Sequence, residues 1–532
     1  MVGISAVRFG AVALLGLVAL GGVALVVAVS PWWWFLAGPL LALAATGVHD
    51  LAQRRHSVLR NYPVLGHARF LLEGIRPELQ QYFVERNFDG RPYDRDVRSI
   101  VYQRAKGTDA EEPFGTERDV YANGYEFLVH SMAPVKEPET PPRVRVGGPD
   151  CTKPYDMALL NVSAMSFGAL SSNAILALNR GAALGGFAHD TGEGGLSEYH
   201  LRAGGDLIWE VGTGYFGCRT TDGDFDPGAF ADKAAQDAVK CVSLKLSQGA
   251  KPGIGGVLPG SKVNAEIARV REVPVGQTVI SPPYHRVFST PRELVRFVAW
   301  MRELATGKPT GFKLCVGSRR QVLALCKAMA DEGVTPDFIV VDGSEGGTGA
   351  APLEFADQLG TPLTEGLITV HNALVGTGLR ERIRLGASGK VATGADIVKR
   401  LLQGADYTNA ARAMMFAVGC IQSQRCHTNK CPVGVATQDP RRGRALEVGD
   451  KSERVRRYQA STVEGAVRIM AAMGVSDPAG LSPHMLRRRL DPHTVRSYGE
   501  LYDWLTPGQL LAEPPEDWAG DWKAADPDRF TV

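Results

Sequence analysis

The sequence predicts an α/β protein built around a closed (β/α)8 TIM barrel, with an N-terminal transmembrane helical hairpin and a small helical C-terminal extension. Three observations lead to this prediction. Residues 9–48 contain no charged side chain, short apolar and amphipathic runs alternate from residue 151 onward, and many of the 61 glycines gather in short clusters between residues 150 and 440. The predicted domains are a hairpin anchor (1–50), an extended collar (51–150), the barrel (151–440) and a helical, Pro-rich tail (441–532).

Two consecutive apolar stretches predict the hairpin. Residues 9–29 (FGAVALLGLVALGGVALVVAV) are long enough to cross a hydrocarbon core, and residues 32–48 (WWWFLAGPLLALAATGV) form a shorter second crossing. A cleaved signal peptide is the alternative, but its apolar core is normally shorter, and here a second apolar run follows directly. We therefore expect a membrane anchor.

Basic residues on both sides of the hairpin predict its orientation. Arg8 precedes it, and Arg54, Arg55 and Arg60 follow it. Because positive flanks stay inside, both ends are expected in the cytoplasm, with Trp32–Trp34 at the far interface. The predicted location is the cell (inner) membrane, with the catalytic body on the cytoplasmic side. In that reducing compartment five scattered cysteines are expected to be reduced, mostly structural thiols: Cys151, Cys218, Cys241, Cys315 and Cys326.

The overall charge argues against a nucleic-acid partner. The chain has 59 basic and 57 acidic residues, a formal net charge of +2, and its basic residues are scattered except near 54–60 and 486–489.

The alternation of apolar and amphipathic runs predicts the barrel. Seven strand-like runs, each with a helical or glycine-rich segment after it, follow one another over about 280 residues. Loops after the strands of such a barrel gather ligand groups at one mouth. An open doubly wound sheet remains an alternative, because periodicity alone does not close a barrel. The seven runs are DMALLNVSAM, CVSLKLS, QTVISPP, GFKLCVG, PDFIVVDG, RIRLGASG and ADYTNAAR.

Three cysteines in one loop predict a redox cluster. In CIQSQRCHTNKCP, Cys420, Cys426 and Cys431 are separated by five and four residues, and a proline follows the last. Three thiolates suit a three-iron, four-sulfide cluster in which each iron takes one cysteine. A zinc site with His427 as fourth ligand is an alternative, although adjacent Cys426 and His427 reach one ion awkwardly, and coincidence is another.

The same loop, CIQSQRCHTNKCPVGVATQDP, resembles the cluster loop of the glutamate synthase family. KLSQGAKPGIGGVLPGSKV, SPPYH, DGSEGGTGAAP and TGEGG are also similar to that family's flavin and substrate loops, and GRPYDRDVRSIVYQRAKG is similar to its short stand-alone members. The resemblance covers roughly residues 150 to 440. It implies an FMN-bearing barrel with a [3Fe-4S] cluster that reduces 2-iminoglutarate, formed from 2-oxoglutarate and ammonia, to L-glutamate.

The chain departs from the long enzymes of that family. Its N-terminus is a hydrophobic hairpin in place of an amidotransferase domain with an N-terminal cysteine, and 92 tail residues leave no room for a large β-helical domain. Release of ammonia from glutamine is therefore expected to need a separate amidotransferase.

The loops after the predicted strands supply candidates for FMN. An FMN phosphate needs backbone amides and hydroxyls at a helix start, which GASGKVATGAD offers, although Thr393 as an ordinary helix cap is the alternative. Lys313, at a strand's end, can stabilise negative charge on a reduced flavin, with a buried ion pair as the alternative. The resemblance implies Ser163–Ser166 beside the ring, and Ala411 and Arg412 at the phosphate. The candidates are Ser163, Ala164, Met165, Ser166, Lys313, Asp342, Gly346, Gly347, Thr348, Ser388, Gly389, Thr393, Gly394 and Arg412.

A dicarboxylate keto acid needs cationic and amide donors, which Lys245, Gln248 and Lys251 of KLSQGAKPG provide. Glu193 of TGEGG is expected to position the reacting group or gate electron arrival, or else to structure its loop. Ser166 is also a candidate substrate contact. His285 of SPPYH matches the family pattern, but a lone histidine more often satisfies local hydrogen bonds.

The predicted function is an FMN and iron–sulfur oxidoreductase of the glutamate synthase type. No dinucleotide fingerprint lies at a strand-to-helix junction, so the electron donor is expected to be a separate protein, ferredoxin or a partner reductase. The alternatives are N-methylglutamate synthase-like chemistry with methylamine as amino donor, a membrane electron-transfer module without synthase activity, and a scaffold without cofactors.

Overall fold

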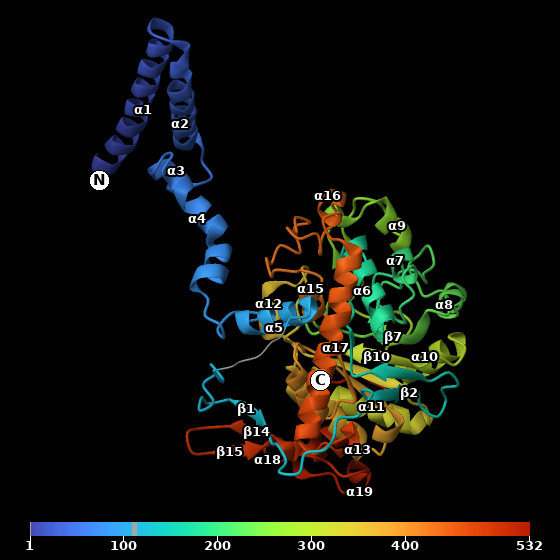
Figure 1. Cartoon of the computed structure of the whole chain (residues 1–532). Helices are drawn as coiled ribbons and strands as arrows, with labels where there is room; N and C mark the ends of the chain where they lie inside the picture. The colour runs from blue at the N-terminus through green and yellow to red at the C-terminus, as the bar shows by residue number, and fades with distance from the viewer. Residues whose placement is uncertain (1, 109–113) are drawn as a thin grey trace. The chain divides into compact units, whose positions relative to one another are not determined.

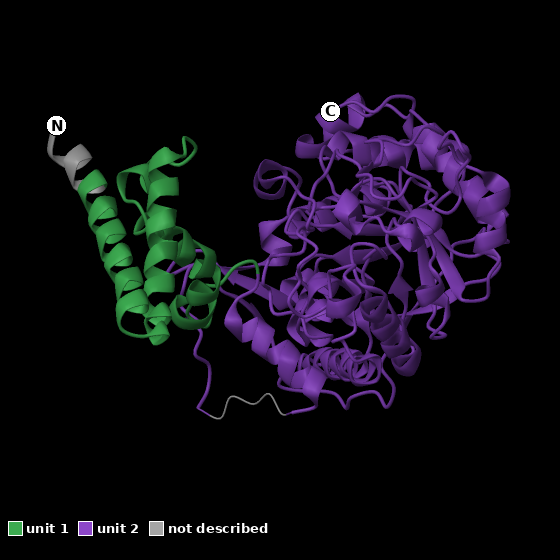
Figure 2. Ribbon diagram, turned by 90° about the horizontal axis from the view of Figure 1, so that it is seen from above, with its two compact units in different colours: residues 1–92 green, residues 93–532 purple. Residues whose placement is uncertain are grey.

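The computed structural model describes residues 2–108 and 114–532, with side chains described from residue 9 onward in the first helix, so that the Arg8 side chain lies outside the described set. The chain divides into two compact units, Met1–Pro92 and Tyr93–Val532 (Figure 2).

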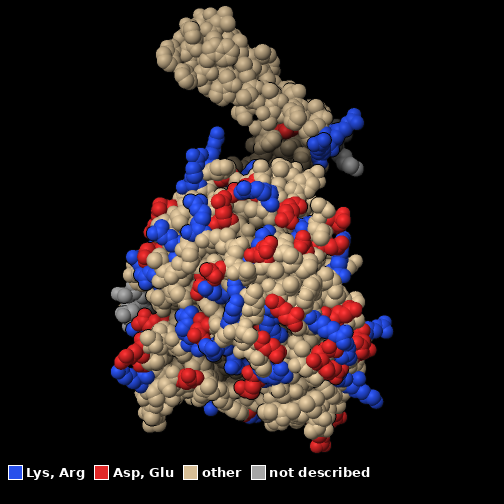
Figure 3. Space-filling view, turned by 90° about the vertical axis from the view of Figure 1, so that its right-hand side faces the viewer, with Lys and Arg blue, Asp and Glu red and all other residues tan. Residues whose placement is uncertain are grey.

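The first unit begins with a helical hairpin, formed by α1 (Val2–Ala28) and α2 (Trp34–Ala52) with the short turn η1 (Pro31–Trp33) between them (Figure 1). The two helices approach closely where glycine removes the side chain. A Cβ on Gly22 would lie 3.2 Å from Ala37, and one on Gly47 would lie 3.1 Å from Val12. Segments Phe9–Ala28 and Pro31–Ala52 are long and apolar enough to cross a membrane. Figure 3 shows the hairpin as almost uncharged surface.

Short helices follow the hairpin, namely α3 (Ser57–Asn61), α4 (Gly66–Leu79) and the π-turn η2 (Gln80–Val84). Asp50, fully buried at the end of α2, holds α4 in place. Its carboxylate accepts hydrogen bonds from the Val64 amide at 2.9 Å and from His67 Nε2 at 3.0 Å. Much of the segment predicted as an extended collar is therefore helical.

The second unit is a closed barrel of eight parallel strands in the order β4-β5-β6-β7-β10-β11-β12-β13, with β13 beside β4. The closure excludes an open doubly wound sheet. The strands are β4 (Leu160–Val162), β5 (His189–Asp190), β6 (Leu207–Val211), β7 (Val239–Lys245), β10 (Thr310–Leu314), β11 (Phe338–Asp342), β12 (Arg384–Ser388) and β13 (Tyr407–Ala410).

One predicted barrel strand is wrong and two barrel strands were not predicted. The run QTVISPP contributes only β9 (Val279–Ile280), which pairs antiparallel with β8 (Val257–Leu258) outside the barrel. Strands β5 and β6 take its place. A two-residue strand has no readable periodicity, and the fully buried run of β6 has no alternation that separates it from a buried helix.

Helices surround the barrel, and capping residues mark several of their starts. Thr290 and Glu293 form a capping box at α10 with Pro291 in the first turn, and Ser171 caps α6. The surrounding helices are α6 (Ser172–Gly185), α7 (Glu198–Leu201), α8 (Pro227–Ala234), α9 (Ala265–Arg271), α10 (Pro291–Leu304), α11 (Arg319–Glu332), α12 (Leu353–Gln358), α13 (Leu363–Gly376), α14 (Gly394–Leu402) and α15 (Arg412–Ala417).

Segments before and after the barrel pack onto it. The hairpin of β2 (Arg143–Val146) and β3 (Tyr155–Ala158) adds Val146 and Met157 to a cluster with inward-facing barrel residues. The tail contributes α17 (Val448–Ala472), which packs against α6, α14 and α5 (Arg95–Lys106). Strand β14 (Leu486–Arg489) pairs with β1 (Glu126–Leu128) on one side and with β15 (Val495–Ser497) on the other, and α20 (Glu516–Ala524) packs against α11.

Candidate active site

The predicted substrate residues meet in one buried cluster at the barrel mouth. Lys245, the last residue of β7, lies 2.9 Å from the carboxylate of Glu193, and it donates to Gln248 Oε1 at 2.8 Å. Lys251 is 2% exposed and donates to the carbonyl of Gly255. The structure thus brings Glu193, Lys245, Gln248 and Lys251 together as the sequence predicts.

The electrostatics of this cluster favour an anion. Burial alone would raise the pKa of Glu193, but Lys245, and then Lys251 and Arg271, lower it to about 2. Burial lowers the pKa of Lys251 to about 8, with Glu193 opposing the shift and Lys245 adding to it. One carboxylate facing several cations leaves an excess of positive charge, which suits a dicarboxylate ligand.

Arg271 belongs to this cluster, and sequence reasoning missed it. It is 5% exposed at the end of α9 and donates to Ser166 Oγ at 3.2 Å and to the Phe167 carbonyl at 3.0 Å. Its guanidinium also lies 5.1 Å from the centre of the Phe216 ring. A signal was present, because Arg271 lies four residues after Ile267 on the helix and so shares its buried face.

His285 holds a loop in place. It is 3% exposed, its Nδ1 lies 3.0 Å from the Tyr215 hydroxyl, and its Nε2 lies 2.9 Å from the Lys245 carbonyl. Both ring nitrogens therefore have a hydrogen-bond partner, which fits the alternative that this histidine satisfies local hydrogen bonds.

Lys313 forms a buried ion pair with Glu210 of β6. Such a pair was the alternative to a role beside the flavin in the sequence analysis. Asp190 of β5 is the second acid beside it, and burial followed by the Glu210 charge raises the pKa of Asp190 to about 8. Although burial would lower the pKa of Lys313, Glu210 and Asp190 raise it, so the ammonium stays charged. A lysine has three N–H donors, so this pair leaves capacity for a further acceptor. Sequence reasoning missed both acids.

The first predicted flavin segment lies against the TGEGG loop. A Cβ on Gly192 would lie 2.7 Å from the Ser166 amide, and one on Gly194 would lie 2.8 Å from the Ser166 side chain. Ser163 and Met165 are buried, Ala164 is half-buried, and the Ser163 hydroxyl lies 3.2 Å from that of Ser388, the last residue of β12.

Glycines after β11 allow three loops to touch. The Asp342 carboxylate accepts a hydrogen bond from the Gly249 amide at 2.8 Å, and a Cβ on Gly346 would lie 2.8 Å from the Ala250 amide. One on Gly347 would lie 3.2 Å from a guanidinium nitrogen of Arg412. Thr348 is exposed. The structure therefore brings the Gly346–Gly347 backbone and Arg412 together.

The predicted phosphate loop has mixed roles. Thr393 caps α14 by accepting from the Asp396 amide at 3.2 Å, and a Cβ on Gly394 would lie 2.4 Å from the amide of Ala466 in α17. These two residues therefore serve helix capping and helix packing. Ser388 is buried at the end of β12, with Gly389 half-buried after it.

Arg412 begins α15, directly after the half-buried Ala411, and donates to the Glu345 carbonyl at 2.6 Å. Its guanidinium lies 5.0 Å from the centre of the Tyr93 ring.

Unpartnered polar atoms at this mouth fit a flavin nucleotide. Within the described residues, Asn409 Oδ1 and the Ser243 hydroxyl are buried and have no hydrogen-bond partner. Asn409 pairs in register with Ser388, the predicted phosphate-side residue. Buried polar groups normally find a partner, so these atoms, together with the glycine-lined loops, fit a ligand with polar edges.

The three cysteines of the predicted cluster lie near one another. Cys431 is buried, and Cys420 and Cys426 are half-buried. Burial raises the pKa of Cys420 to about 12, although the Gln422 amide opposes the shift, and the charges of Cys426 and Cys431 raise it further. In the described part of the chain no three or more metal-ligating side chains converge on one ion position.

Lys262 lies beside these thiols, and sequence reasoning missed it. It is 3% exposed and donates to the carbonyls of Ala169 at 3.2 Å and Ala436 at 3.3 Å. Burial lowers its pKa, while Cys426 and Cys431 oppose that shift.

The segment YDRDVRSIVYQRAKG attaches α5 to the cysteine loop. The Tyr93 amide donates to Gln422 Oε1 at 3.2 Å, Gln422 Nε2 donates to the Tyr93 carbonyl at 3.0 Å, and the Tyr102 hydroxyl donates to the Cys420 carbonyl at 2.7 Å. The second unit therefore begins on the cysteine loop.

These features define a class: a parallel-barrel enzyme whose mouth gathers buried cations, glycine-lined loops and a cysteine loop. The model for the conserved region in glutamate synthase matches residues 151–476. The glutamate synthase large subunit-like protein YerD of Bacillus subtilis is 38% identical over 498 residues, which are 86% of this chain and 94% of that protein. The chain belongs to the glutamate synthase family.

Other relatives are shorter matches. The archaeal-type glutamate synthase [NADPH] of Thermotoga neapolitana is 34% identical over 316 residues, which are 59% of each chain. The archaeal glutamate synthase [NADPH] of Methanocaldococcus jannaschii is 33% identical over 330 residues, 62% of this chain and 61% of that protein. A solved flavocytochrome b2 mutant with pyruvate bound aligns with this chain at TM-score 0.43 and 15% identity, covering 88% of this chain and 97% of that chain. The chain is an oxidoreductase of the glutamate synthase type.

Proposed function

We propose that this chain reduces 2-iminoglutarate, formed from 2-oxoglutarate and ammonia, to L-glutamate, using FMN, a [3Fe-4S] cluster and electrons from a separate protein. The observation that carries the proposal is the buried cluster in which Lys245, Lys251 and Arg271 surround Glu193 at the barrel mouth. The proposal accounts for burying so much positive charge, because the substrate carries two carboxylates that would offset it.

The cluster residues would bind and orient the substrate. Arg271, held by Ser166 and Phe167, presents a planar guanidinium that suits a carboxylate. Lys245 and Lys251 supply ammonium donors on the same side as the Gln248 amide. The ion pair with Glu193 keeps Lys245 oriented, and the Gly255 carbonyl holds Lys251, so the donors are in place before the substrate arrives.

FMN would be held by Ser163–Ser166, Gly346, Gly347, Ser388, Gly389 and Arg412, whose loops meet at the mouth. When bound, it supplies the hydride for reduction of a carbon–nitrogen double bond. Lys313 would hold positive charge beside it, and the pair with Glu210 keeps that lysine protonated.

Cys420, Cys426 and Cys431 would each bind one iron of the [3Fe-4S] cluster. Lys262 places a buried positive charge beside Cys426 and Cys431, which would offset thiolate charge. Ferredoxin or a partner reductase would supply electrons, a separate amidotransferase would supply ammonia from glutamine, and the hairpin would attach the chain to the cell (inner) membrane with the barrel on the cytoplasmic side.

The test is an anaerobic experiment on the purified full chain. We expect one FMN and three irons per chain and an EPR signal of an oxidised [3Fe-4S] cluster. In C426S iron is expected to fall, whereas the matched control C326S, which changes a buried thiol on α11, keeps its iron.

Chemically reduced protein is then mixed with 2-oxoglutarate and ammonia, with methylamine or glutamine replacing ammonia in parallel samples. We expect flavin reoxidation and glutamate formation with ammonia. Faster reoxidation with methylamine would redirect the proposal to N-methylglutamate chemistry. A flavin that stays reduced with every amino donor would refute the synthase proposal.

A further inference from the structure

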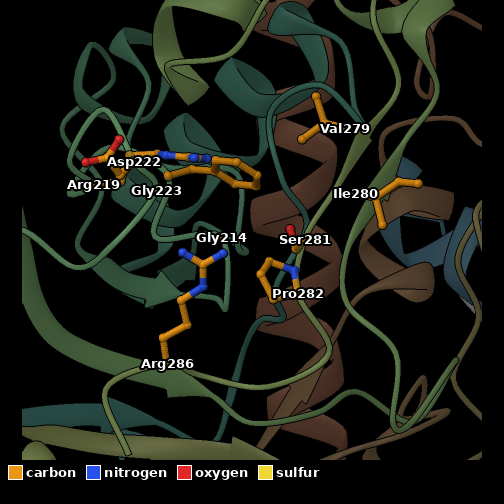
Figure 4. A pocket seen from close by; sticks show the side chains of 10 residues that line it. Gly214, Arg219, Asp222, Gly223, Val279, Ile280, Ser281, Pro282 and Arg286 are labelled. Atoms are coloured by element: carbon orange, nitrogen blue, oxygen red, sulfur yellow. The ribbon is translucent and has the colours of Figure 1, made fainter.

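A pocket lies beside the predicted substrate loop. Its volume is about 170 Å³, and it lies between the loop after β6 and the segment that contains β9 (Figure 4). Ser281 and Pro282 of its lining belong to the SPPYH motif, and no lining residue was a site candidate from the sequence. Its charged lining residues are Arg219, Asp222 and Arg286.

Two of the three charged side chains of this pocket contact neighbouring residues. Arg219 lies with its guanidinium 5.7 Å from the centre of the Phe216 ring, and Arg286 is paired with Asp224 at 3.0 Å. Among the described residues no salt bridge joins Arg219 or Asp222 to another side chain, so both charges are available to a ligand. Figure 4 shows Arg219 and Asp222 on one wall, Ser281 on the facing wall, and the Arg286 guanidinium pointing between them.

A buried hydroxyl supplies an independent sign of a ligand. Ser281 lines the pocket and is 4% exposed, and within the described chain its Oγ has no hydrogen-bond partner. Buried hydroxyls are normally satisfied, so a polar group at this position would complete the set.

The pocket shares its wall with the substrate cluster. The Ser281 amide donates to the Gly256 carbonyl at 2.8 Å, and a Cβ on Gly256 would lie 2.5 Å from Glu193 Oε1. The backbone of Gly255 and Gly256 therefore contacts Ser281 of the pocket and also Glu193 and Lys251 of the substrate cluster. Phe216 forms a second link, because it lies beneath Arg219 and also beneath Arg271.

We propose that this pocket binds a small α-amino dicarboxylic acid, with glutamate as the fitting member, at a site distinct from the substrate cluster. The two guanidinium groups match two carboxylates, the Asp222 carboxylate matches the ammonium, and Ser281 Oγ donates to a carboxylate oxygen. This inference rests on the proposed function for its biological sense, because glutamate would be the product, but the binding itself is independent of turnover.

The experiment measures glutamate binding to oxidised full-length holoprotein by calorimetry, with 2-oxoglutarate present at saturation to occupy the substrate cluster. We expect glutamate to bind under these conditions, with R219Q and R286Q each weakening it about tenfold or more. The matched control is R296Q, which changes an exposed arginine paired with Glu332 on the outer helix layer.

Glutarate lacks the amino group, so comparing it with glutamate separates the contacts to the carboxylates from the contact to the ammonium group. D222N is expected to weaken glutamate binding without weakening glutarate binding, because glutarate has no ammonium group for this carboxylate to pair with. Equal effects of D222N on both ligands would overturn the assigned ammonium contact, and glutamate binding that 2-oxoglutarate abolishes would overturn the second site. If imine reduction fails but this binding remains, the proposed function is wrong and the pocket stands.

Discussion

The pH dependence of substrate binding follows from Lys251. Burial lowers the pKa of this lysine to about 8, so the substrate cluster loses a positive charge as the pH rises through that value. If the 2-oxoglutarate dianion binds only to the protonated form, its apparent dissociation constant grows with the deprotonated fraction. A pKa of about 8 then predicts a roughly tenfold weaker affinity at pH 9 than at pH 7, equivalent to about 1.4 kcal/mol.

The assay is calorimetric titration of oxidised protein with 2-oxoglutarate between pH 6.5 and pH 9.5. In K251M the affinity is expected to be lower at pH 7 and nearly independent of pH over this range. In E193Q the inflection moves to lower pH, because Glu193 opposes the downward shift of the Lys251 pKa. The control is K153M, which removes an exposed lysine that bonds Thr306.

The reasoning is refuted if wild-type affinity stays constant from pH 7 to pH 9, or if K251M keeps the wild-type profile. The first result would show that Lys251 does not titrate near pH 8, and the second would place the titrating group elsewhere.

Three further predictions concern the surrounding structure. K313M leaves the Glu210 carboxylate buried without its cation, and it is expected to destabilise the folded chain by about 3–5 kcal/mol, measured as a fall in thermal midpoint, which K313R partly restores. Gly249→Ala would bring a Cβ to 1.7 Å from the Gly343 carbonyl, so soluble yield should fall sharply, and an unchanged melting curve would contradict the close contact. Gln422→Ala removes both hydrogen bonds to Tyr93, and limited trypsin digestion should then cut the α5 segment faster than in wild type.

Much of the barrel was readable from the sequence because its strands are apolar runs with helices after them. Six of the seven predicted runs contribute barrel strands. The prediction of a barrel strand at QTVISPP was wrong, because a short apolar stretch suits a small antiparallel pair as well as it suits a barrel strand. Only the position of its partner strand β8 decides which of the two forms. Strand β5 is two residues long and leaves no periodic signal.

In the candidate site, too, some residues were predicted from the sequence and others were missed. Loop motifs placed Glu193, Lys245, Gln248 and Lys251 correctly in one cluster. Arg271 and Lys262 escaped notice because each lies in a segment whose helical or turn character explains its presence without reference to a site.

By itself the sequence determined the alternation that builds a barrel, the apolar hairpin, and the residue types on the loops after the strands. These depend on local periodicity and on chemistry that each residue carries wherever it lies. The tertiary structure alone decided which charges meet. Lys313 pairs with Glu210, and Arg219 shares a pocket with Ser281, because barrel closure brings together residues separated by tens of positions, and the distance between two charges sets their interaction.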